Sequence, residues 1–378
     1  MIRYLEPRLK KDLRKKMVFL LGARQVGKTT LAKDMAREQG GQYLSWDNLE
    51  DRAVITTRAW NKRAPLLALD EIHKMPDWKQ WLKGVYDGKP VAQQILITGS
   101  ARIDTFRLSG ESLAGRYFPL RMHPLSVHEL CTLSPEKPSA SAAFEQLLAR
   151  GGFPEPCLNS DAIDAARWRK QYYEGMVRDD ILEFSRLHEV AAMRLFVELL
   201  RTRVGSPLSL AAIARDLHLA PVTLKRYLDI LEALYIVFTI KPWHKNIARA
   251  TQHMPKVYFF DSGLVKGDAG TLFENIAANH LLKYSEWQQD ALGKEVELHY
   301  IRTKDEAEID FALRDGDELT HLIECKISDI KPHRALVRFA SEAPQARAIQ
   351  LVQDAPHQMV LGNITVCPAA QWLFNLGV

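Results

Sequence analysis

The chain has 378 residues, of which 47% are hydrophobic and 26% are charged, the balance of folded domains in water. This length suits about two to four domains. The formal net charge of +5 permits binding to nucleic acid without requiring it. The four cysteines are scattered without the spacing of a metal site, and no apolar run is long enough for a membrane span. These features exclude a disulfide framework and favour a cytoplasmic protein with reduced thiols and no membrane partner.

The first motif follows a short apolar run and fits the phosphate-binding P-loop, G-x-x-x-x-G-K-[ST]. Met17–Leu21 predicts a buried strand and Thr29–Arg37 a helix, the context that this motif requires. The predicted nucleotide-binding residues are Gly22, Ala23, Arg24, Gln25, Val26, Gly27, Lys28, Thr29 and Thr30. The glycines let backbone amides face phosphate oxygens. Lys28 is expected to reach the β- and γ-phosphates of ATP and to act in catalysis, and the Thr29 hydroxyl to ligate Mg²⁺.

A second apolar run, residues 65–69, ends in the acids Asp70 and Glu71. Such a run is typical of a central parallel strand with both faces covered. Asp70 is expected to hold the Mg²⁺ shell. Glu71 is expected to orient or deprotonate the attacking water. The alternative is an ordinary acidic pair at a strand end.

A third strand is predicted at Gln94–Ser100 and ends in small polar residues. Ligands of parallel sheets gather at the carboxyl ends of strands, so Thr98 or Ser100 is expected to sense the γ-phosphate. The alternative is that Thr98, Gly99 and Ser100 only form a turn.

These segments resemble a prokaryotic AAA+ ATPase family whose members carry a nuclease-like domain of unknown function at the C-terminus. The likeness rests on Gly22–Thr30, Leu69–Lys74, Ile97–Ser100, Ser112–Tyr117 and Gly151–Pro154. It implies an ATP-dependent enzyme and extends over almost the whole chain.

Two residues of the resembling segments have further readings. Arg116 follows a glycine, and its guanidinium suits phosphate oxygens, so it is expected to serve as an arginine finger in cis or across a homo-oligomer interface. A surface or structural ion pair is the alternative for Arg116. Pro154 resembles the proline in the lid of signal-transduction ATPases, which implies a contact with adenine. A turn between helices is the alternative for Pro154.

The middle of the chain predicts helices. Periodic Trp168, Tyr172, Val177 and Ile181 indicate a helical core face. Arg178 and Asp179 match a pair in the resembled family, for which a salt bridge between helices is the default interpretation.

Residues 208–234 read as helix-turn-helix. Ser209 caps the first helix and Pro221 opens the second, whose expected buried face is Leu224, Tyr227, Leu228 and Leu231. Residues 235–240 and 256–260 would supply the wing of a winged helix. Thr223, Lys225 and Arg226 are then expected to contact DNA. A protein-binding scaffold is the alternative.

Three strands are predicted near the C-terminus, at Val296–Arg302, Glu308–Leu313 and Thr320–Ser328. Glu324 and Lys326 share one strand face, with Cys325 opposite. A hairpin would bring Asp310 beside Glu324, and Glu274 of an upstream helix would complete a carboxylate set for Mg²⁺ or Mn²⁺. Lys326 would position or deprotonate a metal-activated water. A cross-strand salt bridge is the alternative.

The pattern Asp310, then Glu324-x-Lys326, resembles the core signature of PD-(D/E)XK nucleases. The resemblances together imply an α/β fold, in which a P-loop NTPase (AAA+-like) parallel sheet is followed by a helical lid, a winged helix and a PD-(D/E)XK nuclease-like domain. The expected boundaries are 1–132, 140–195, 196–260 and 261–378.

Three functions are compatible with this organisation. The first is an ATPase motor or switch joined to a metal-dependent nuclease that acts on DNA. The second is a nucleotide-dependent scaffold or signalling switch whose C-terminal module binds without cutting. The third is a transcription regulator that uses the winged helix, although the small net charge argues against extensive sequence-independent DNA binding.

Overall fold

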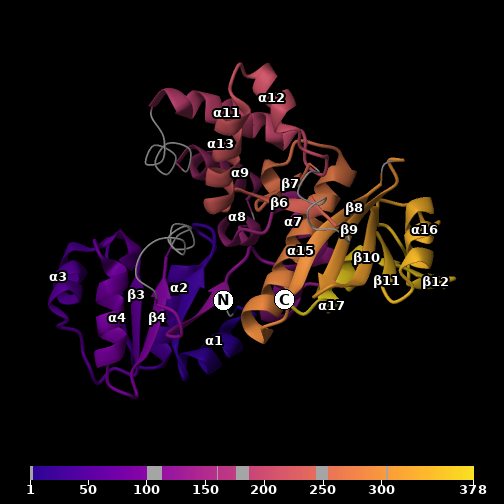
Figure 1. Ribbon diagram of the computed structural model, residues 1–378. Helices are drawn as coiled ribbons and strands as arrows, with labels where there is room; N and C mark the ends of the chain where they lie inside the picture. Colours follow the sequence, from indigo (N-terminus) through magenta and orange to yellow (C-terminus); the bar gives the residue numbers. More distant parts are fainter. Residues whose placement is uncertain (1–2, 100–112, 160, 176–186, 244–253, 304) are drawn as a thin grey trace. The chain divides into compact units, whose positions relative to one another are not determined.

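The computed structural model describes residues 3–99, 113–159, 161–175, 187–243, 254–303 and 305–378 (Figure 1). Contacts divide the chain into two compact units. One comprises Met1–His123 with Ala233–Tyr235, and the other comprises Pro124–Glu232 with Ile236–Val378. The predicted Ser100, Ser112, Val177, Arg178, Asp179 and Ile181 lie outside the described residues.

The described part of the first unit alternates helices and strands. Its elements are α1 (Glu6–Leu13), β1 (Met17–Leu21), α2 (Lys28–Glu38), β2 (Gln42–Ser45), α3 (Leu49–Thr57), β3 (Leu66–Asp70), the 3₁₀ helix η1 (Ile72–Lys74), α4 (Trp78–Gly88), β4 (Gln94–Thr98) and β5 (Tyr117–Arg121). The predicted strand before the P-loop and the helix after it are both confirmed.

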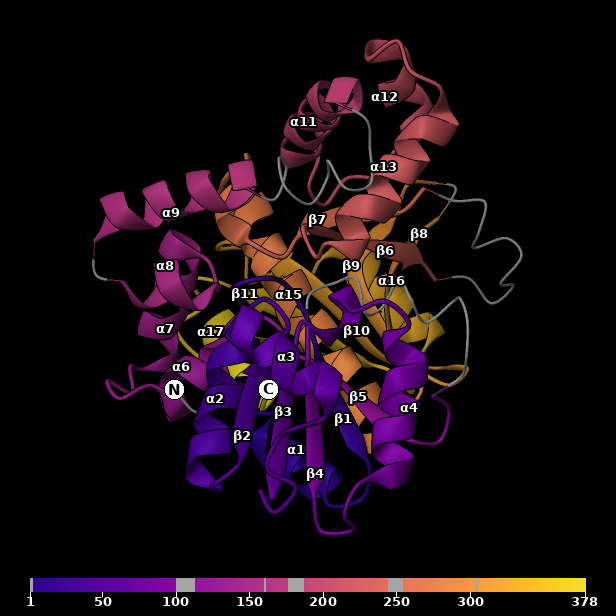
Figure 2. The same cartoon turned by 90° about the vertical axis from the view of Figure 1, so that its left-hand side faces the viewer.

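The strands of the first unit form one sheet in the order β2-β3-β4-β1-β5, and every neighbouring pair is parallel (Figure 2). Both faces of this sheet are covered. Phe19, Leu69 and Ile97 pack in a core with α3 and α4, while the alternate residues of the same strands are also buried. Helices α1 and α2 contact the sheet as well. Coverage of both faces explains why β1 and residues 66–69 of β3 are uninterrupted apolar runs.

The described part of the second unit begins with helices and ends in a sheet. Its helices are α6 (Val127–Leu133), α7 (Ala140–Arg150), α8 (Pro154–Leu158), α9 (Ala162–Gly175), α11 (Leu187–Arg201), α12 (Leu210–Asp216), α13 (Pro221–Ala233), η4 (Ser262–Leu264), α15 (Ala269–Leu292), α16 (Arg334–Glu342) and α17 (Ala369–Asn375). Its strands are β6 (Val237–Pro242), β7 (Lys256–Phe259), β8 (Val296–Arg302), β9 (Glu308–Asp315), β10 (Glu318–Lys326), β11 (Arg347–Val352), β12 (Met359–Leu361) and β13 (Ile364–Pro368).

These eight strands form a single mixed sheet in the order β12-β13-β11-β10-β9-β8-β6-β7. The predicted C-terminal strands are confirmed as β8, β9 and β10, which pair antiparallel. The predicted wing strands do form a hairpin, β6–β7, and β6 also pairs in parallel with β8 at Lys241 and Pro242. The hairpin after the helix pair is therefore one edge of the C-terminal sheet.

The two faces of this sheet are covered by different helices (Figure 1). Helix α15 contacts β7, β8, β9 and β10, and α16 packs on β9, β10, β11 and β13. Phe311 meets the ring of Tyr258, whereas Ala312, the next residue, packs in the core that includes α16. This alternation places neighbouring side chains of β9 in different environments.

The predicted helix-turn-helix segments are confirmed as the helices α12 and α13. Ser209 accepts a hydrogen bond from Ala212 N at 3.3 Å, which caps α12 as expected. The expected buried face of α13, Leu224, Tyr227, Leu228 and Leu231, is buried. Within the described residues, no helix has both the length and the apolar character that crossing a bilayer requires.

Candidate functional site

The P-loop joins β1 to α2 through a backbone that needs glycine. Gly22 has φ 137° and Gly27 has φ 103°, both in the region that disfavours side chains. A Cβ added to Gly22 would collide with the carbonyl oxygen of Met122. Gln25 also takes a positive φ, of 59°. This curled path is what directs successive amides towards one anion-binding point at the start of α2.

Lys28, the first residue of α2, folds back over the loop. Its Nζ donates to the carbonyl oxygens of Gly22 at 2.9 Å and of Ala23 at 2.6 Å. The side chain is buried, and burial lowers the pKa of Lys28 to about 8. The ammonium is thus held inside the loop, where phosphate oxygens are expected.

Asp70, at the end of β3, accepts hydrogen bonds from three hydroxyl groups. Thr29 Oγ1 lies 2.9 Å from Oδ2 of Asp70, and Tyr43 Oη lies 2.6 Å from the same oxygen. Thr98 Oγ1 lies 2.6 Å from Oδ1. Three neighbouring strands and the P-loop helix therefore fix one carboxylate at the carboxyl edge of the sheet.

Glu71 follows Asp70 in a left-handed conformation with φ 55°. Its backbone N–H donates to Thr98 O at 2.9 Å, which anchors this unusual turn to β4. Its Oε2 lies 3.4 Å from His73 Nε2 and 3.5 Å from Lys74 Nζ. Burial raises the pKa of Glu71 above its ordinary value. A raised pKa makes this carboxylate a better proton acceptor than an ordinary glutamate.

The residues of this site fit a nucleoside triphosphate with Mg²⁺. The loop supplies the glycine-dependent cradle, Lys28 supplies the cation, and the pair Thr29–Asp70 supplies oxygen ligands of the type that Mg²⁺ takes. Thr98 contacts Asp70 directly, so the predicted polar strand end belongs to the same cluster.

Arg116 lies just before β5 and pairs with Asp87 of α4. Its Nε and Nη2 donate to the two carboxylate oxygens at 2.9 and 3.1 Å. Both side chains are partly exposed. The structural ion pair that was the alternative to an arginine finger is therefore present.

The segment with Pro154 lies in the second unit, where its two glycines allow neighbouring groups to approach the backbone closely. Gly151 has φ 72°, and a Cβ there would meet the carboxylate of Asp261. A Cβ on Gly152 would lie 2.8 Å from Leu125 O. Pro154 is the first residue of α8, in keeping with the turn between helices. Its contact with adenine stays a prediction.

The predicted DNA-contacting residues lie on α13. Lys225 and Arg226 are exposed, while Thr223 is half-buried. Lys225 forms an ion pair with Asp229 one turn later, and the guanidinium of Arg226 lies 5.9 Å from the centroid of the Tyr227 ring. The exposed face thus carries basic groups, one of which is paired within the helix.

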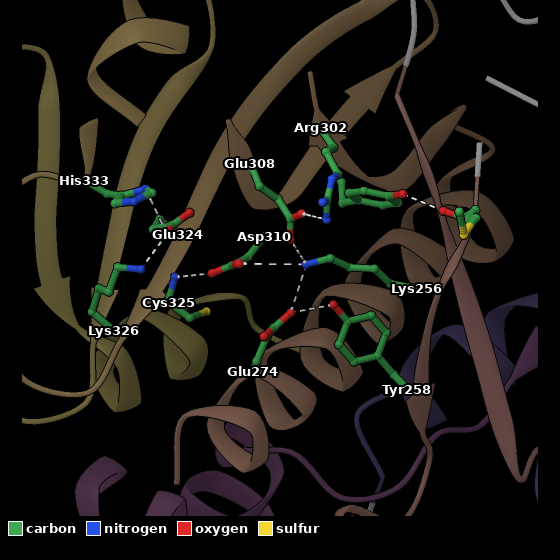
Figure 3. A network of polar contacts seen from close by, with 12 residues as sticks. Lys256, Tyr258, Glu274, Arg302, Glu308, Asp310, Glu324, Cys325, Lys326 and His333 are labelled. Atoms are coloured by element: carbon green, nitrogen blue, oxygen red, sulfur yellow. Dashed lines mark hydrogen bonds and ion pairs between the residues drawn. The ribbon is translucent and has the colours of Figure 1, made fainter. Parts of the chain in front are cut away.

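A second cluster lies between β7, β9 and the N-terminal part of α15 (Figure 3). Its centre is Lys256, whose Nζ lies 2.6 Å from Glu308 Oε1 and 3.3 Å from Glu274 Oε1. Asp310 Oδ1 is 3.9 Å from the same nitrogen. The hydroxyl of Tyr258 donates to Glu274 at 2.7 Å. Three carboxylates therefore surround one ammonium group.

Glu324 and Lys326 contact one another on β10, as their shared strand face predicts. Lys326 Nζ donates to Glu324 Oε1 at 2.7 Å, and His333 Nδ1 lies 3.1 Å from the same oxygen. Asp310 is also close, because its Oδ2 accepts a hydrogen bond from the backbone N–H of Cys325 at 2.9 Å.

Burial and the charge of Asp310 raise the pKa values of both Glu274 and Glu324. For Lys256, burial by itself lowers the pKa, but the carboxylates of Glu274, Asp310 and Glu308 together raise it well above its ordinary value.

The expected metal set of Glu274, Asp310 and Glu324 stays a prediction that the arrangement of the side chains does not support. Across the described residues, no group of three or more Asp, Glu, His or Cys side chains is arranged to hold a metal ion. The physical reason is that two lysine side chains already pair with these carboxylates. Lys256 stands between Glu274 and Asp310, and Lys326 neutralises Glu324. In this arrangement the residues do not fit Mg²⁺ or Mn²⁺.

Sequence reasoning missed Tyr43, Tyr258, Glu308 and Lys256 as members of the two clusters. Lys256 carried a usable signal, since it is the single charged residue in the otherwise uncharged run of residues 254–260. A buried charge in an apolar strand needs partners. Tyr43 carried no comparable signal, because a tyrosine in a strand is common.

Three family models match successive parts of the chain. Residues 14–131 match an AAA domain. Residues 141–270 and residues 269–372 match two separate families, each described as a domain of unknown function. Together with the P-loop geometry, the first match identifies residues 14–131 as a P-loop, AAA-type ATPase domain.

Relatives resemble the chain over most of its length. An uncharacterized protein of Mycobacterium tuberculosis is 28% identical, over 98% of this chain and 84% of its own. An uncharacterized protein of Methanocaldococcus jannaschii is 21% identical, over 79% of this chain and 72% of its own.

Solved structures give weaker likenesses. The RuvB Holliday junction branch migration motor of Thermotoga maritima aligns with a TM-score of 0.31 and 19% identity, over 62% of this chain and 85% of that one. A signal transduction ATPase of Pyrococcus horikoshii with a tetratricopeptide repeat sensor aligns with a TM-score of 0.26 and 13% identity, over 78% of this chain and 48% of that one. Scores of this size do not show a common fold, so the assignment rests on the family match and the site.

Proposed function

We propose that the protein is an ATP-hydrolysing switch whose AAA-type domain regulates a DNA-binding, nuclease-like unit. The observation that carries the proposal is the convergence of Lys28, Thr29 and Asp70 at the carboxyl edge of a parallel sheet. These are the groups that phosphoryl transfer needs for positioning and charge neutralisation.

Each of these residues has a defined task. Lys28 exchanges its two carbonyl acceptors for phosphate oxygens when ATP enters the loop. Thr29 and Asp70 would hold Mg²⁺, which supplies charge neutralisation at the phosphates. Thr98 and Tyr43 keep the Asp70 carboxylate in one orientation. Glu71 accepts a proton from the attacking water at its carboxylate.

Turnover of ATP tests this part of the proposal. Lys28→Ala removes the only ammonium that folds into the described loop, so we expect hydrolysis to fall by about 100-fold or more, the loss typical of one transition-state contact. Arg37→Ala, on the exposed end of the same helix, is the matched control and should retain wild-type turnover. Equal rates in wild type and Lys28→Ala would remove the P-loop assignment.

The DNA part of the proposal concerns α13 and the β6–β7 hairpin, which would act as a winged helix. Exchanging Lys225 and Arg226 for glutamate should weaken duplex binding and flatten its salt dependence. The control exchanges two exposed basic residues of α9, Arg167 and Lys170. Equal weakening by both double variants would indicate a general charge effect and not a contact surface.

A second candidate function is a switch whose nuclease-like module binds without cutting. The position of Lys256 among Glu274, Glu308 and Asp310 favours it over metal-dependent cleavage. Supercoiled plasmid with Mn²⁺ distinguishes the two. Nicking by wild type that is absent in Asp310→Ala and Glu324→Ala would support a PD-(D/E)XK-like nuclease. Intact plasmid in all three would support the binding module.

A further inference from the structure

Lys256 is among the least exposed charged residues described, with 1% of its surface accessible. It enters the cluster from β7, and three carboxylates from α15 and β9 approach its Nζ. The ring of Tyr300 lies 5.3 Å from the same nitrogen. A lone buried ammonium is costly, so this ring and these acids are the reason that it can be charged here.

The carboxylates depend on the ammonium in the same way. Glu274 has Lys256 and the Tyr258 hydroxyl as its described partners. Glu308 forms ion pairs with both Lys256 and Arg302. Nη1 of Arg302 lies 3.0 Å from Oε2 of Glu308. Removal of the ammonium would leave negative charges facing one another in a place shielded from water.

The space around the cluster is narrow. A Cβ added to Gly205 would lie 2.8 Å from Glu274 Oε2, so the loop before α12 closes over this carboxylate. The backbone of Lys256 is fixed as well, because it pairs with Ile240 of β6 and bridges to Pro207. The side chain therefore cannot leave by a small shift of its own strand.

We propose that the Lys256 ammonium is the resident cation of this cluster and that it excludes a divalent ion from Glu274 and Asp310. A divalent ion ligated by both acids would have to sit within about 2.6 Å of their oxygens. The ammonium occupies that neighbourhood, at 3.3 Å from one acid and 3.9 Å from the other. Two cations this close repel one another strongly where water is scarce.

This inference uses the same carboxylates as the proposed nuclease-like site, but its test does not depend on cleavage. Binding of Mn²⁺ to the full chain is measured without nucleotide, by the loss of the electron paramagnetic resonance signal of free Mn²⁺. The set is wild type, Lys256→Met, Lys256→Arg and the double variant Lys256→Met with Glu274→Gln. Methionine preserves much of the length of the side chain and removes its charge.

We expect Lys256→Met to bind one more Mn²⁺ than wild type, or to bind it at least about tenfold tighter, and the double variant to lose this gain. Lys256→Arg keeps the positive charge and should behave like wild type. Equal Mn²⁺ binding by wild type and Lys256→Met would overturn the proposal.

Circular dichroism establishes that each variant is folded. If Lys256→Met does not fold, wild type and Asp310→Asn decide the question. Stoichiometric Mn²⁺ on wild type that is lost in Asp310→Asn contradicts a resident ammonium, and absence of Mn²⁺ from wild type supports it. ATP turnover and plasmid nicking are separate measurements, so a failure of this inference and a failure of the proposed function are distinguishable.

Discussion

The hydroxyl of Tyr43 donates a hydrogen bond of 2.6 Å to Asp70 Oδ2, the oxygen that also faces Thr29. Tyr43 lies on β2, the strand beside β3, two residues from its end. Burial raises the pKa of the Tyr43 hydroxyl, and the hydrogen bond to Asp70 raises it further. The edge of the sheet therefore presents Asp70 in a fixed orientation.

The exchange Tyr43→Phe should impair the use of Mg²⁺ more than the binding of ATP. A hydrogen bond to a charged group contributes about 1.5–3 kcal/mol, so we expect roughly a tenfold or greater rise in the Mg²⁺ concentration needed for half-maximal turnover. Titration of ATPase activity with Mg²⁺ measures it. Tyr86→Phe, on α4, serves as the control, and an unchanged Mg²⁺ requirement in Tyr43→Phe would exclude an orienting role.

The lowered pKa of Lys28 predicts a pH dependence of nucleotide binding. Phosphate oxygens favour the ammonium form, and in the empty loop this form is lost as the pH rises through about 8. Affinity for ATP should therefore fall above that pH, by up to about tenfold per pH unit. Titrations of a fluorescent ATP analogue between pH 7 and pH 9 measure it. Lys28→Arg, which stays charged, should give a flat profile.

The lowered pKa of Lys28 also makes the free energy of unfolding depend on pH, but in the opposite direction to ATP binding. Between about 8 and the ordinary value of 10.5, the unfolded chain binds more protons at Lys28 than the folded chain. The contribution of Lys28 to the free energy of unfolding therefore rises with pH across this window. Denaturant titrations of wild type and Lys28→Met in the absence of nucleotide should diverge in that direction.

Arg116 and Asp87 can be tested as a pair. If the role of Arg116 is the ion pair seen here, Arg116→Ala and Asp87→Ala should both retain ATP turnover within about twofold, because exposed pairs contribute little. An arginine finger predicts a different pattern, in which Arg116→Ala alone loses about a thousandfold or more. Steady-state turnover, measured at several protein concentrations, separates these outcomes.

Lys283 and Glu129 form a fully buried ion pair between α15 and α6. Lys283 Nζ also donates to Pro124 O and to Ser126 Oγ, each at 3.1 Å. Glu129→Ala alone should lower the free energy of unfolding by about 3–5 kcal/mol, because it leaves a buried charge. The double variant Glu129→Leu with Lys283→Met should regain most of that loss in urea unfolding, and equal losses in both would contradict this account.

The sequence was most informative where one segment contains its own signal. The P-loop required a strand before it and a helix after it, and both are present as β1 and α2. The spacing of Leu224, Tyr227, Leu228 and Leu231 predicted the buried face of α13, since helical periodicity is local. The contact of Lys326 with Glu324 followed from strand alternation.

Features that depend on pairing between distant segments were not predictable in this way. Nothing in residues 237–242 indicates that β6 lies against β8. Without knowledge of that pairing, the sequence did not indicate that Lys256 lies beside Glu274 and Asp310. The acids were therefore interpreted as ligands that were free to bind a metal ion. Tyr43 lies close to Asp70 because β2 is next to β3 in the sheet. The order of strands in a sheet cannot be derived from the hydrophobic periodicity of the sequence.

The hairpin β6–β7 has a practical consequence for dissecting the chain. A fragment beginning at residue 261 would lack both strands. Strand β8 would then be an edge strand with unpaired backbone N–H and C=O groups. The same cut would remove Lys256 and leave mutually repelling acids behind. Such a fragment is expected to precipitate, and any binding or activity assay of the C-terminal sheet in isolation should use a fragment that starts upstream of the helix pair.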